Sequence, residues 1–190
     1  MWRSVLLIRV AIQVTAPSMP DATAEAYAEI LQREGAKRGF DPITVVAIVE
    51  NESHWNSHLV GGTDNKCVGL GQHCLQNYAY CRGSYEDSRC QAQKAYLLNG
   101  GNNLVATAQA ISGWRKYCRR LTGRDPLVHR WLFGYQGHSV NNHAHQCGMR
   151  RTTRGWVDVP KPPLVKRVLR RRAEILRAAQ RVLASGKRRR

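Results

Sequence analysis

The sequence has few acidic residues for its length, and it contains no long hydrophobic run. Thirteen Asp and Glu stand against 30 Lys and Arg in 190 residues, which gives a formal net charge of +17 at pH 7. No stretch approaches the roughly 18 uncharged apolar residues that a membrane-spanning helix needs, so we do not expect an integral membrane protein. Hydrophobic residues make up 43% of the chain, which is typical of a globular protein and argues against a wholly disordered one.

The excess positive charge lies mainly near the C-terminus. Residues 161–190 contain 12 basic residues and one acid, so they carry +11, and the first 160 residues carry the remaining +6. Apolar residues from Val165 to Leu183 recur at intervals of three or four positions, with arginines between them. The pattern predicts a basic amphipathic helical tail over residues 160–190. A protein this positive accumulates at a polyanion, which charge alone does not identify.

No two cysteines have the Cys-x-x-Cys spacing of a zinc ribbon or a thioredoxin-like motif. An even number of cysteines spread through a small domain instead predicts up to three disulfides and an oxidising compartment, with the pairing left open. The alternatives are six buried thiols in a cytosolic core and a zinc site at His143, His145 and Cys147. The disulfide candidates are Cys67, Cys74, Cys81, Cys90, Cys118 and Cys147.

Residues 1–20 are expected to be either a signal-like segment or an irregular arm. Arg3 followed by the apolar residues 5–8 is typical of the start of a signal peptide, and Ala22-Thr23-Ala24 is similar to a cleavage site. Arg9, however, interrupts a hydrophobic region that is already short. The cysteines argue for export more strongly than this segment does, so we expect a secreted, periplasmic or cell-envelope protein.

Helical periodicity dominates residues 21–159, which we expect to form one mainly α domain. Asp41-Pro42 supplies an N-cap with proline at the first helical position, so the β-branched run after it is expected to be a helix. Gly100-Gly101 is expected to end one helix, and Asp125-Pro126 to cap another. Residues 56–87, rich in Gly, Asn, Ser and Cys, predict a long loop or small hairpin region held by cysteines. Besides the helix after Asp41, the predicted helices cover residues 23–37, 90–98, 103–121 and 125–133.

The predicted helix after Asp41 carries two acids at its C-terminal end, Glu50 and Glu52. An acid there lies near the negative pole of the helix dipole, and apolar neighbours such as Val49 and Trp55 would desolvate it. Both effects favour the protonated carboxyl that a general acid needs. Residues two apart point about 200° from each other on a helix, so only one acid can face a given cleft. Taken alone, the pattern is explained better by two solvated glutamates at a helix end.

The residues after Glu50 form four blocks in a fixed order. They are Glu52-Ser53-His54-Trp55-Asn56, Gly69-Leu70-Gly71-Gln72, Ala95-Tyr96-Leu97-Leu98 and Phe133-Gly134-Tyr135-Gln136-Gly137. In this order the blocks resemble the lysozyme-like lytic transglycosylases of bacterial cell walls, and also the related goose-type lysozymes. The resemblance runs from residue 42 to about residue 140, and it implies a lysozyme-like α fold for residues 21–159.

The resemblance implies that Glu52 is the catalytic acid and base. In the family, one glutamate protonates the oxygen between N-acetylmuramic acid and N-acetylglucosamine, and it then takes a proton from the muramyl 6-hydroxyl, which attacks the anomeric carbon. No metal or organic cofactor is implied. Each residue that matches a substrate-binding position could instead have a structural role. These residues are Ser53, Gly69, Leu70, Gln72, Tyr135 and Gln136.

The loop before Gly69 departs from the transglycosylase pattern. It is slightly longer, it lacks the usual serine, and its stretch from Gly62 to Asn65 is more similar to the goose-type loop. Asp64 is therefore a second candidate carboxylate, which would allow inverting hydrolysis if about 6.5–9.5 Å separated it from the carboxyl of Glu52. A turn-forming role for Asp64 beside Asn65 is the simpler interpretation. The block at Tyr135-Gln136-Gly137 is one residue shorter than the family's.

The expected partners are peptidoglycan glycan strands. The basic tail has three interpretations: the last helix of the domain, a contact with an anionic envelope polymer or membrane surface, or a nucleic-acid contact. We rank nucleic acid last because no helix-turn-helix, zinc-finger or aromatic RNA-binding signature accompanies the charge. A non-catalytic basic protein that binds glycan or nucleic acid is the alternative to an enzyme, and the oligomeric state stays open.

Overall fold

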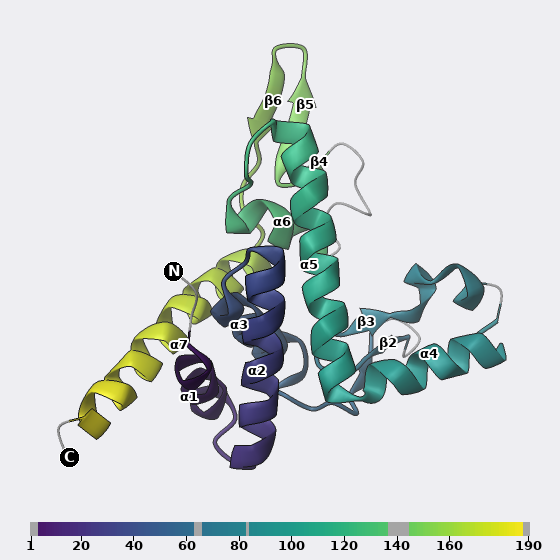
Figure 1. Cartoon of the computed structure of the whole chain (residues 1–190). Helices are drawn as coiled ribbons and strands as arrows, with labels where there is room; N and C mark the ends of the chain where they lie inside the picture. The colour runs from purple at the N-terminus through teal and green to yellow at the C-terminus, as the bar shows by residue number, and fades with distance from the viewer. Residues whose placement is uncertain (1–3, 63–65, 83, 137–144, 188–190) are drawn as a thin grey trace. The chain divides into compact units, whose positions relative to one another are not determined.

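The structure is a computed structural model that describes residues 4–62, 66–82, 84–136 and 145–187. Within these residues it has seven α-helices, two small three-stranded sheets and two short 3-10 turns (Figure 1). The predicted mainly α class is therefore confirmed. The lysozyme-like fold expected for residues 21–159 stays a prediction.

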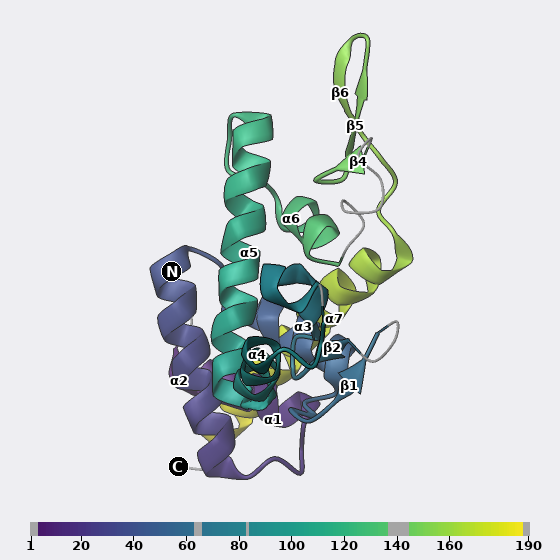
Figure 2. The ribbon, with the colours of Figure 1, turned by 90° about the vertical axis from the view of Figure 1, so that its right-hand side faces the viewer.

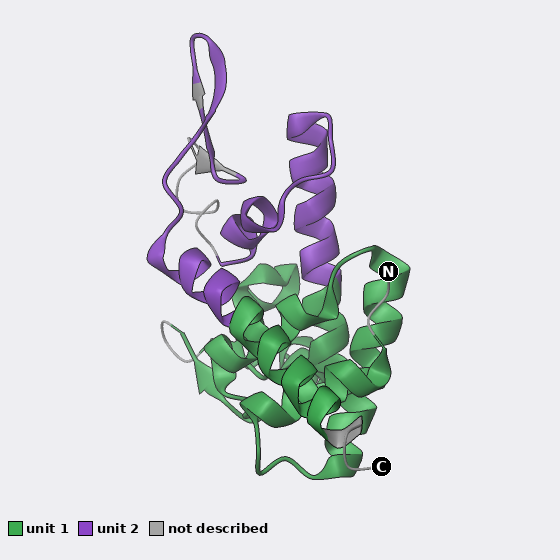
Figure 3. Cartoon of the chain, turned by 90° about the vertical axis from the view of Figure 1, so that its left-hand side faces the viewer, with its two compact units in different colours: residues 1–108, 172–190 green, residues 109–171 purple. Residues whose placement is uncertain are grey.

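The chain forms two compact units, which Figure 3 shows in different colours. Unit 1 comprises residues 1–108 and 172–190, and unit 2 comprises residues 109–171. Helices α5 (Gly100–Thr122) and α7 (Pro163–Lys187) each contribute residues to both units.

Three helices of unit 1 pack against one another: α1 (Val5–Thr15), α2 (Asp21–Arg38) and α3 (Pro42–Ser53). The interpretation of residues 1–20 as an irregular arm is wrong. Ser4 caps α1 by accepting a hydrogen bond from the Leu7 N–H at 3.2 Å, and Ile8 and Ile12 are fully buried. Helix α1 therefore belongs to the core of unit 1.

Helix α3 begins where the sequence predicts. Asp41 Oδ1 accepts a hydrogen bond from the Ile43 N–H at 3.2 Å, and Pro42 lies in the first turn, where its missing N–H would be unpaired in any case. Residues 42–49 are all buried, so tertiary packing overrides the weak intrinsic preference of β-branched residues for strands. Arg172 of α7 also donates to Asp41 Oδ2. The cap carboxylate thus links α3 to α7.

Residues 56–87 form a small sheet and two turns, as the sequence predicts. The sheet has the antiparallel order β1-β2-β3, built from β1 (Val60–Gly61), β2 (Cys67–Val68) and β3 (His73–Cys74). Figure 1 labels β2 and β3, and Figure 2 labels β1 and β2. The 3-10 turns η2 (Leu75–Asn77) and η3 (Ala79–Cys81) follow it and lead to α4 (Ser88–Leu98). Two disulfides, Cys67–Cys74 and Cys81–Cys90, hold this region.

The pair Gly100-Gly101, expected to end a helix, begins one instead. Helix α4 has already ended at Leu98, and Asn99 Oδ1 accepts a hydrogen bond from the Asn102 N–H at 3.0 Å in the first turn of α5. Glycine is required at position 100 because a Cβ there would lie 2.0 Å from the hydroxyl of Tyr27. A close contact with α2 therefore selects this glycine.

Unit 2 combines the C-terminal part of α5 with α6 (Val128–Tyr135) and a second sheet. The sheet has the antiparallel order β4-β5-β6, built from β4 (His145–Gln146), β5 (Met149–Thr152) and β6 (Gly155–Asp158). The disulfide Cys118–Cys147 joins α5 to the turn between β4 and β5.

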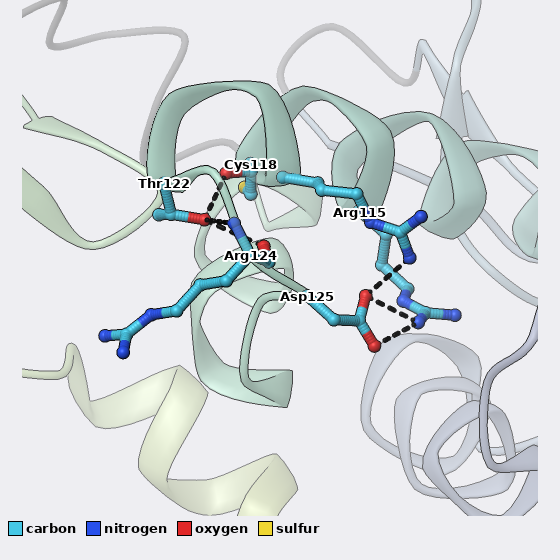
Figure 4. A network of polar contacts seen from close by, with 6 residues as sticks. Arg115, Cys118, Thr122, Arg124 and Asp125 are labelled. Carbon is cyan, nitrogen blue, oxygen red and sulfur yellow. Dashed lines mark hydrogen bonds and ion pairs between the residues drawn. The ribbon is translucent and has the colours of Figure 1, made fainter.

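The predicted cap of α6 is wrong. The helix begins at Val128 with Leu127 as N-cap and without a side-chain cap. Asp125 instead accepts hydrogen bonds from Arg115 at 3.0 Å and from Arg119 at 2.7 Å (Figure 4). Charge-assisted bonds to two guanidinium groups are stronger than one N-cap bond, so the carboxylate turns toward α5.

Helix α7 forms most of the segment predicted as a helical tail. The residues of its apolar stripe that are fully buried are Val165, Val168, Ile175 and Ala179. This part of the stripe is packed within the protein, whereas Val182 near the C-terminal end of the helix is 51% exposed.

All six cysteines are paired, as Cys67–Cys74, Cys81–Cys90 and Cys118–Cys147. The alternative of six buried thiols is wrong, and the proposed zinc site loses Cys147 as a ligand. Disulfides persist in oxidising compartments. Among the described helices, none combines the length and the apolar character of a membrane span.

Candidate active site

Glu52 lies in the last turn of α3, at the negative end of the helix dipole. Its side chain is half-buried, and Asn51 Nδ2 lies 3.4 Å from its Oε1. Glu50 faces another side of the helix, because successive residues are turned by about 100°. The expected location of Glu52 at the end of a buried helix is confirmed, and its catalytic role stays a prediction.

The backbone directly after Glu52 adopts an uncommon conformation. His54 and Trp55 have φ angles of 50° and 66°, in the left-handed region that costs a non-glycine residue about 1–3 kcal/mol. Contacts hold this turn: the Trp55 indole N–H donates to Thr15 Oγ1 at 2.9 Å, and its ring stacks on Tyr27 with 6.1 Å between centroids. Helices α1 and α2 thus fix the chain that follows the candidate acid.

Ser53, a candidate substrate-binding residue, is buried within α3. It is 3% exposed, and its hydroxyl donates to the Val49 carbonyl at 3.1 Å. The structure therefore gives Ser53 a role within the helix.

The turn from Gly69 to Gln72 is shaped by close contacts. Gly69 has a φ angle of 76°, and a Cβ at this position would lie 2.1 Å from Asn103 Nδ2. Leu70 is fully buried. The Gln72 side-chain amide donates to the carbonyls of Gly69 at 2.9 Å and Leu59 at 3.3 Å. The N–H groups of Gln72 therefore stabilise the loop, which leaves its Oε1 for the predicted contact with sugar.

Asn103 of α5 is the residue that fixes this turn, and sequence reasoning missed it. Its side chain is fully buried, Oδ1 accepts from the Gly71 N–H at 2.7 Å, and Nδ2 donates to the carbonyls of Leu97 at 2.7 Å and Val68 at 3.2 Å. One amide thus connects the end of α4, strand β2 and the glycine-rich turn. An Asn-Asn pair at a helix start was the only signal in the sequence, and it resembles ordinary capping.

His73 and Thr107 extend the polar contacts behind the turn. The Thr107 hydroxyl donates to the Asn103 carbonyl at 2.9 Å, so it accepts a hydrogen bond from His73 Nε2 at 3.0 Å. Burial lowers the pKa of His73 to about 4, because a charged imidazole would lose its hydration. His73 is therefore neutral at pH 7, with its proton on Nε2.

The last two predicted contact residues belong to unit 2, and they are described within that unit. Tyr135 ends α6, and Gln136 is the C-cap residue after it. The Gln136 side-chain nitrogen and oxygen are both buried and make no hydrogen bond to the residues that the structure describes. Gly134 beside them packs on Trp114, whose ring would lie 2.3 Å from a Cβ. The predicted roles of Tyr135 and Gln136 in substrate binding stay predictions.

Asp64 lies outside the described residues, as do His143 and the side chain of His145. The two-carboxylate interpretation therefore stays a prediction. Among the described residues, no group of three His, Cys, Asp or Glu side chains is arranged to hold a metal ion.

No known family model, curated protein or solved structure matches this chain. The functional argument therefore rests on the chain's own residues and on the four sequence blocks.

Proposed function

We propose that this protein is a peptidoglycan lytic transglycosylase with Glu52 as its single acid and base. The observation that carries the proposal is the position of Glu52, a half-buried carboxyl in the last turn of the buried helix α3. The carboxyl lies near the negative end of the helix dipole and is partly removed from water. A protonated carboxyl can donate to a glycosidic oxygen while the bond to the sugar breaks.

The reaction needs one carboxyl used twice. Glu52 gives its proton to the oxygen that bridges N-acetylmuramic acid and N-acetylglucosamine, and the C1–O bond of the muramyl sugar breaks. The resulting carboxylate takes the proton of the muramyl 6-hydroxyl as that oxygen bonds to C1. The products are a 1,6-anhydro sugar and a free 4-hydroxyl, and Glu52 is again protonated. No water is consumed.

Two further observations support the proposal. The Gly69–Gln72 turn is held by Asn103 from within the core of unit 1, and binding residues work best on such rigid supports. The three disulfides suit an enzyme that works outside the cytoplasm, in the cell envelope.

The test compares Glu52→Gln with Glu50→Gln on purified glycan strands. Both variants remove one carboxyl from the same turn of α3, but only Glu52 has the proposed role. We expect Glu52→Gln to lower the cleavage rate about a hundredfold or more, as loss of a general acid does, and Glu50→Gln to retain it. Full activity in Glu52→Gln, or equal losses in both variants, would contradict the proposal.

Analysis of the products separates the proposed reaction from hydrolysis. A transglycosylase leaves 1,6-anhydromuramic ends, whereas a hydrolase consumes water and leaves reducing ends. Reducing ends together with loss of activity in Asp64→Asn would establish the two-carboxylate alternative. If the wild-type protein cleaved no glycan at all, the remaining interpretation would be a non-catalytic binding protein.

A further inference from the structure

The positive charge of the chain is distributed unevenly between the two compact units. Residues 109–171, which form unit 2, contain 14 Lys and Arg against 2 Asp and no Glu. Unit 2 therefore carries +12 of the net +17, although it is only a third of the chain. The remaining residues, which include the C-terminal Lys-Arg-Arg-Arg, carry +5. Unit 2 is therefore strongly basic, and it includes five basic residues of the predicted tail, from Lys161 to Arg171.

Both acids of unit 2 are bound by arginines of the same unit. Asp125 accepts from Arg115 and Arg119 (Figure 4), and Asp158 accepts from Arg130 at 2.6 Å. Nine other Lys and Arg side chains of the unit are exposed to solvent. They are Lys116, Arg120, Arg124, Arg150, Arg154, Lys161, Lys166, Arg167 and Arg170. Few acidic groups thus offset this surface from within the unit.

The hairpin of β5 and β6 adds exposed apolar groups to this charge. Trp156 is 37% exposed and Val157 is 41% exposed, both on β6. Val157 pairs with Arg150 across the hairpin, and Arg154 lies in its tight turn. The tip of the hairpin and the C-terminal end of α5, which carries Arg120, point toward the same end of unit 2 (Figures 1 and 2). Arginine and tryptophan therefore share one projecting element.

The base of the hairpin is firmly attached to the rest of unit 2. Cys147 is bonded to Cys118 of α5, and the Val159 N–H donates to the Gly148 carbonyl at 3.0 Å. An isolated two-stranded hairpin is marginally stable in water, so these attachments hold the exposed residues in place. A pre-ordered surface loses less entropy on binding.

We propose that unit 2 is a docking surface for an anionic phospholipid membrane, with the β5–β6 hairpin at the contact. Cations near an anionic bilayer each contribute to binding, and tryptophan prefers the headgroup region, where its ring is apolar and its N–H is wet. A purely phosphate-bearing polymer would use the cations but leave Trp156 and Val157 without a role. Four residues of the apolar stripe of α7, Val165, Val168, Ile175 and Ala179, are fully buried, so the proposed contact is made by the surface of unit 2 and not by this part of α7.

The test uses the full-length protein and vesicles that contain equal amounts of phosphatidylglycerol and phosphatidylcholine. Arg150→Gln/Arg154→Gln removes two charges from the hairpin, and Arg177→Gln/Arg181→Gln removes two exposed charges from unit 1 as a matched control. We expect the hairpin variant to bind about 25-fold more weakly, or about fivefold for each arginine. The control is expected to stay within about threefold of the wild type, since it leaves the proposed surface intact. Equal losses would show that net charge alone acts, and would overturn the proposal.

Trp156→Ala tests the apolar part of the contact. At 0.5 M NaCl, where charge interactions are screened, we expect Trp156→Ala to lose most of the residual binding and Trp156→Phe to retain it. Vesicles of pure phosphatidylcholine, which lack the anionic headgroups, should bind the wild type no more tightly than the anionic vesicles do at 0.5 M NaCl. Tight binding to duplex DNA or to a soluble poly(glycerol phosphate), without binding to the anionic vesicles, would overturn the membrane assignment. Glu52→Gln should bind vesicles like the wild type, so failure of glycan cleavage and failure of membrane docking are separate results.

Discussion

The side chain of Asn103 offers the sharpest test of how unit 1 is held together. Asn103→Ala removes three hydrogen bonds, so it leaves the Gly71 N–H and the carbonyls of Leu97 and Val68 without their partner in a fully buried place. Each unsatisfied buried group costs about 1–3 kcal/mol. Because water can enter the small space left by the amide and restore part of this, we expect a loss of about 3–5 kcal/mol in the free energy of unfolding.

The assay is equilibrium unfolding in urea, with the disulfides intact. Asn102→Ala is the matched control, because Asn102 immediately precedes Asn103 in α5 and its side chain makes no hydrogen bond within the described part of the chain. We expect this control to change stability by less than about 0.5 kcal/mol. If Asn103→Ala stayed within about 1 kcal/mol of the wild type, the amide would not hold the turn and the reasoning would be refuted.

Three further predictions concern stability. Gly69→Ala should lower the free energy of unfolding by about 3 kcal/mol or more, because its positive φ and a contact of 2.1 Å leave no room for a Cβ. Gly113→Ala should instead stabilise α5 by about 0.5–1 kcal/mol in the same urea assay, because a Cβ there would meet no atom within 4 Å. His73 has a pKa near 6.5 in the unfolded chain and about 4 in the folded protein. The free energy of unfolding should therefore fall by up to about 3 kcal/mol as the pH is lowered from 6.5 to 4, and it should level off below pH 4. A chain with His73→Asn that showed the same fall would contradict this assignment. Cys118→Ser/Cys147→Ser opens a loop with a sequence separation of 29 and should lower the unfolding free energy of unit 2 by about 3–4 kcal/mol, measured by thermal unfolding.

The Asp-Pro capping pattern predicted the start of a helix correctly where no other group competed for the same oxygen of the aspartate side chain. Asp41-Pro42 caps α3 as expected, because the carboxylate can serve the Ile43 N–H and Arg172 with different oxygens. Asp125-Pro126 has the same pattern but does not cap α6, because two arginines of α5 take the carboxylate. Such competition depends on residues up to ten positions away, which a capping pattern does not include.

Two other features were beyond sequence reasoning for a similar reason. Arg9 interrupts the apolar run in the sequence, yet it pairs with Glu25 of α2 at 3.2 Å while Ile8 and Ile12 face the core. Asn103 is important only because the backbone of the Gly69–Gln72 turn, more than thirty residues earlier in the chain, lies against the Asn103 side-chain amide. Both features arise from tertiary contacts between distant segments. By contrast, the location of Glu52 in the last turn of α3 followed directly from the cap and the apolar run.

The order in which the cysteines pair has a consequence for biosynthesis. The six cysteines pair in chain order, the first with the second, the third with the fourth and the fifth with the sixth, so no bridge encloses or crosses another. A chain that enters an oxidising compartment from its N-terminus would meet the correct partner for each thiol first. Oxidation in order of arrival therefore yields the native pairing, and maturation should need an oxidase but little help from a disulfide isomerase.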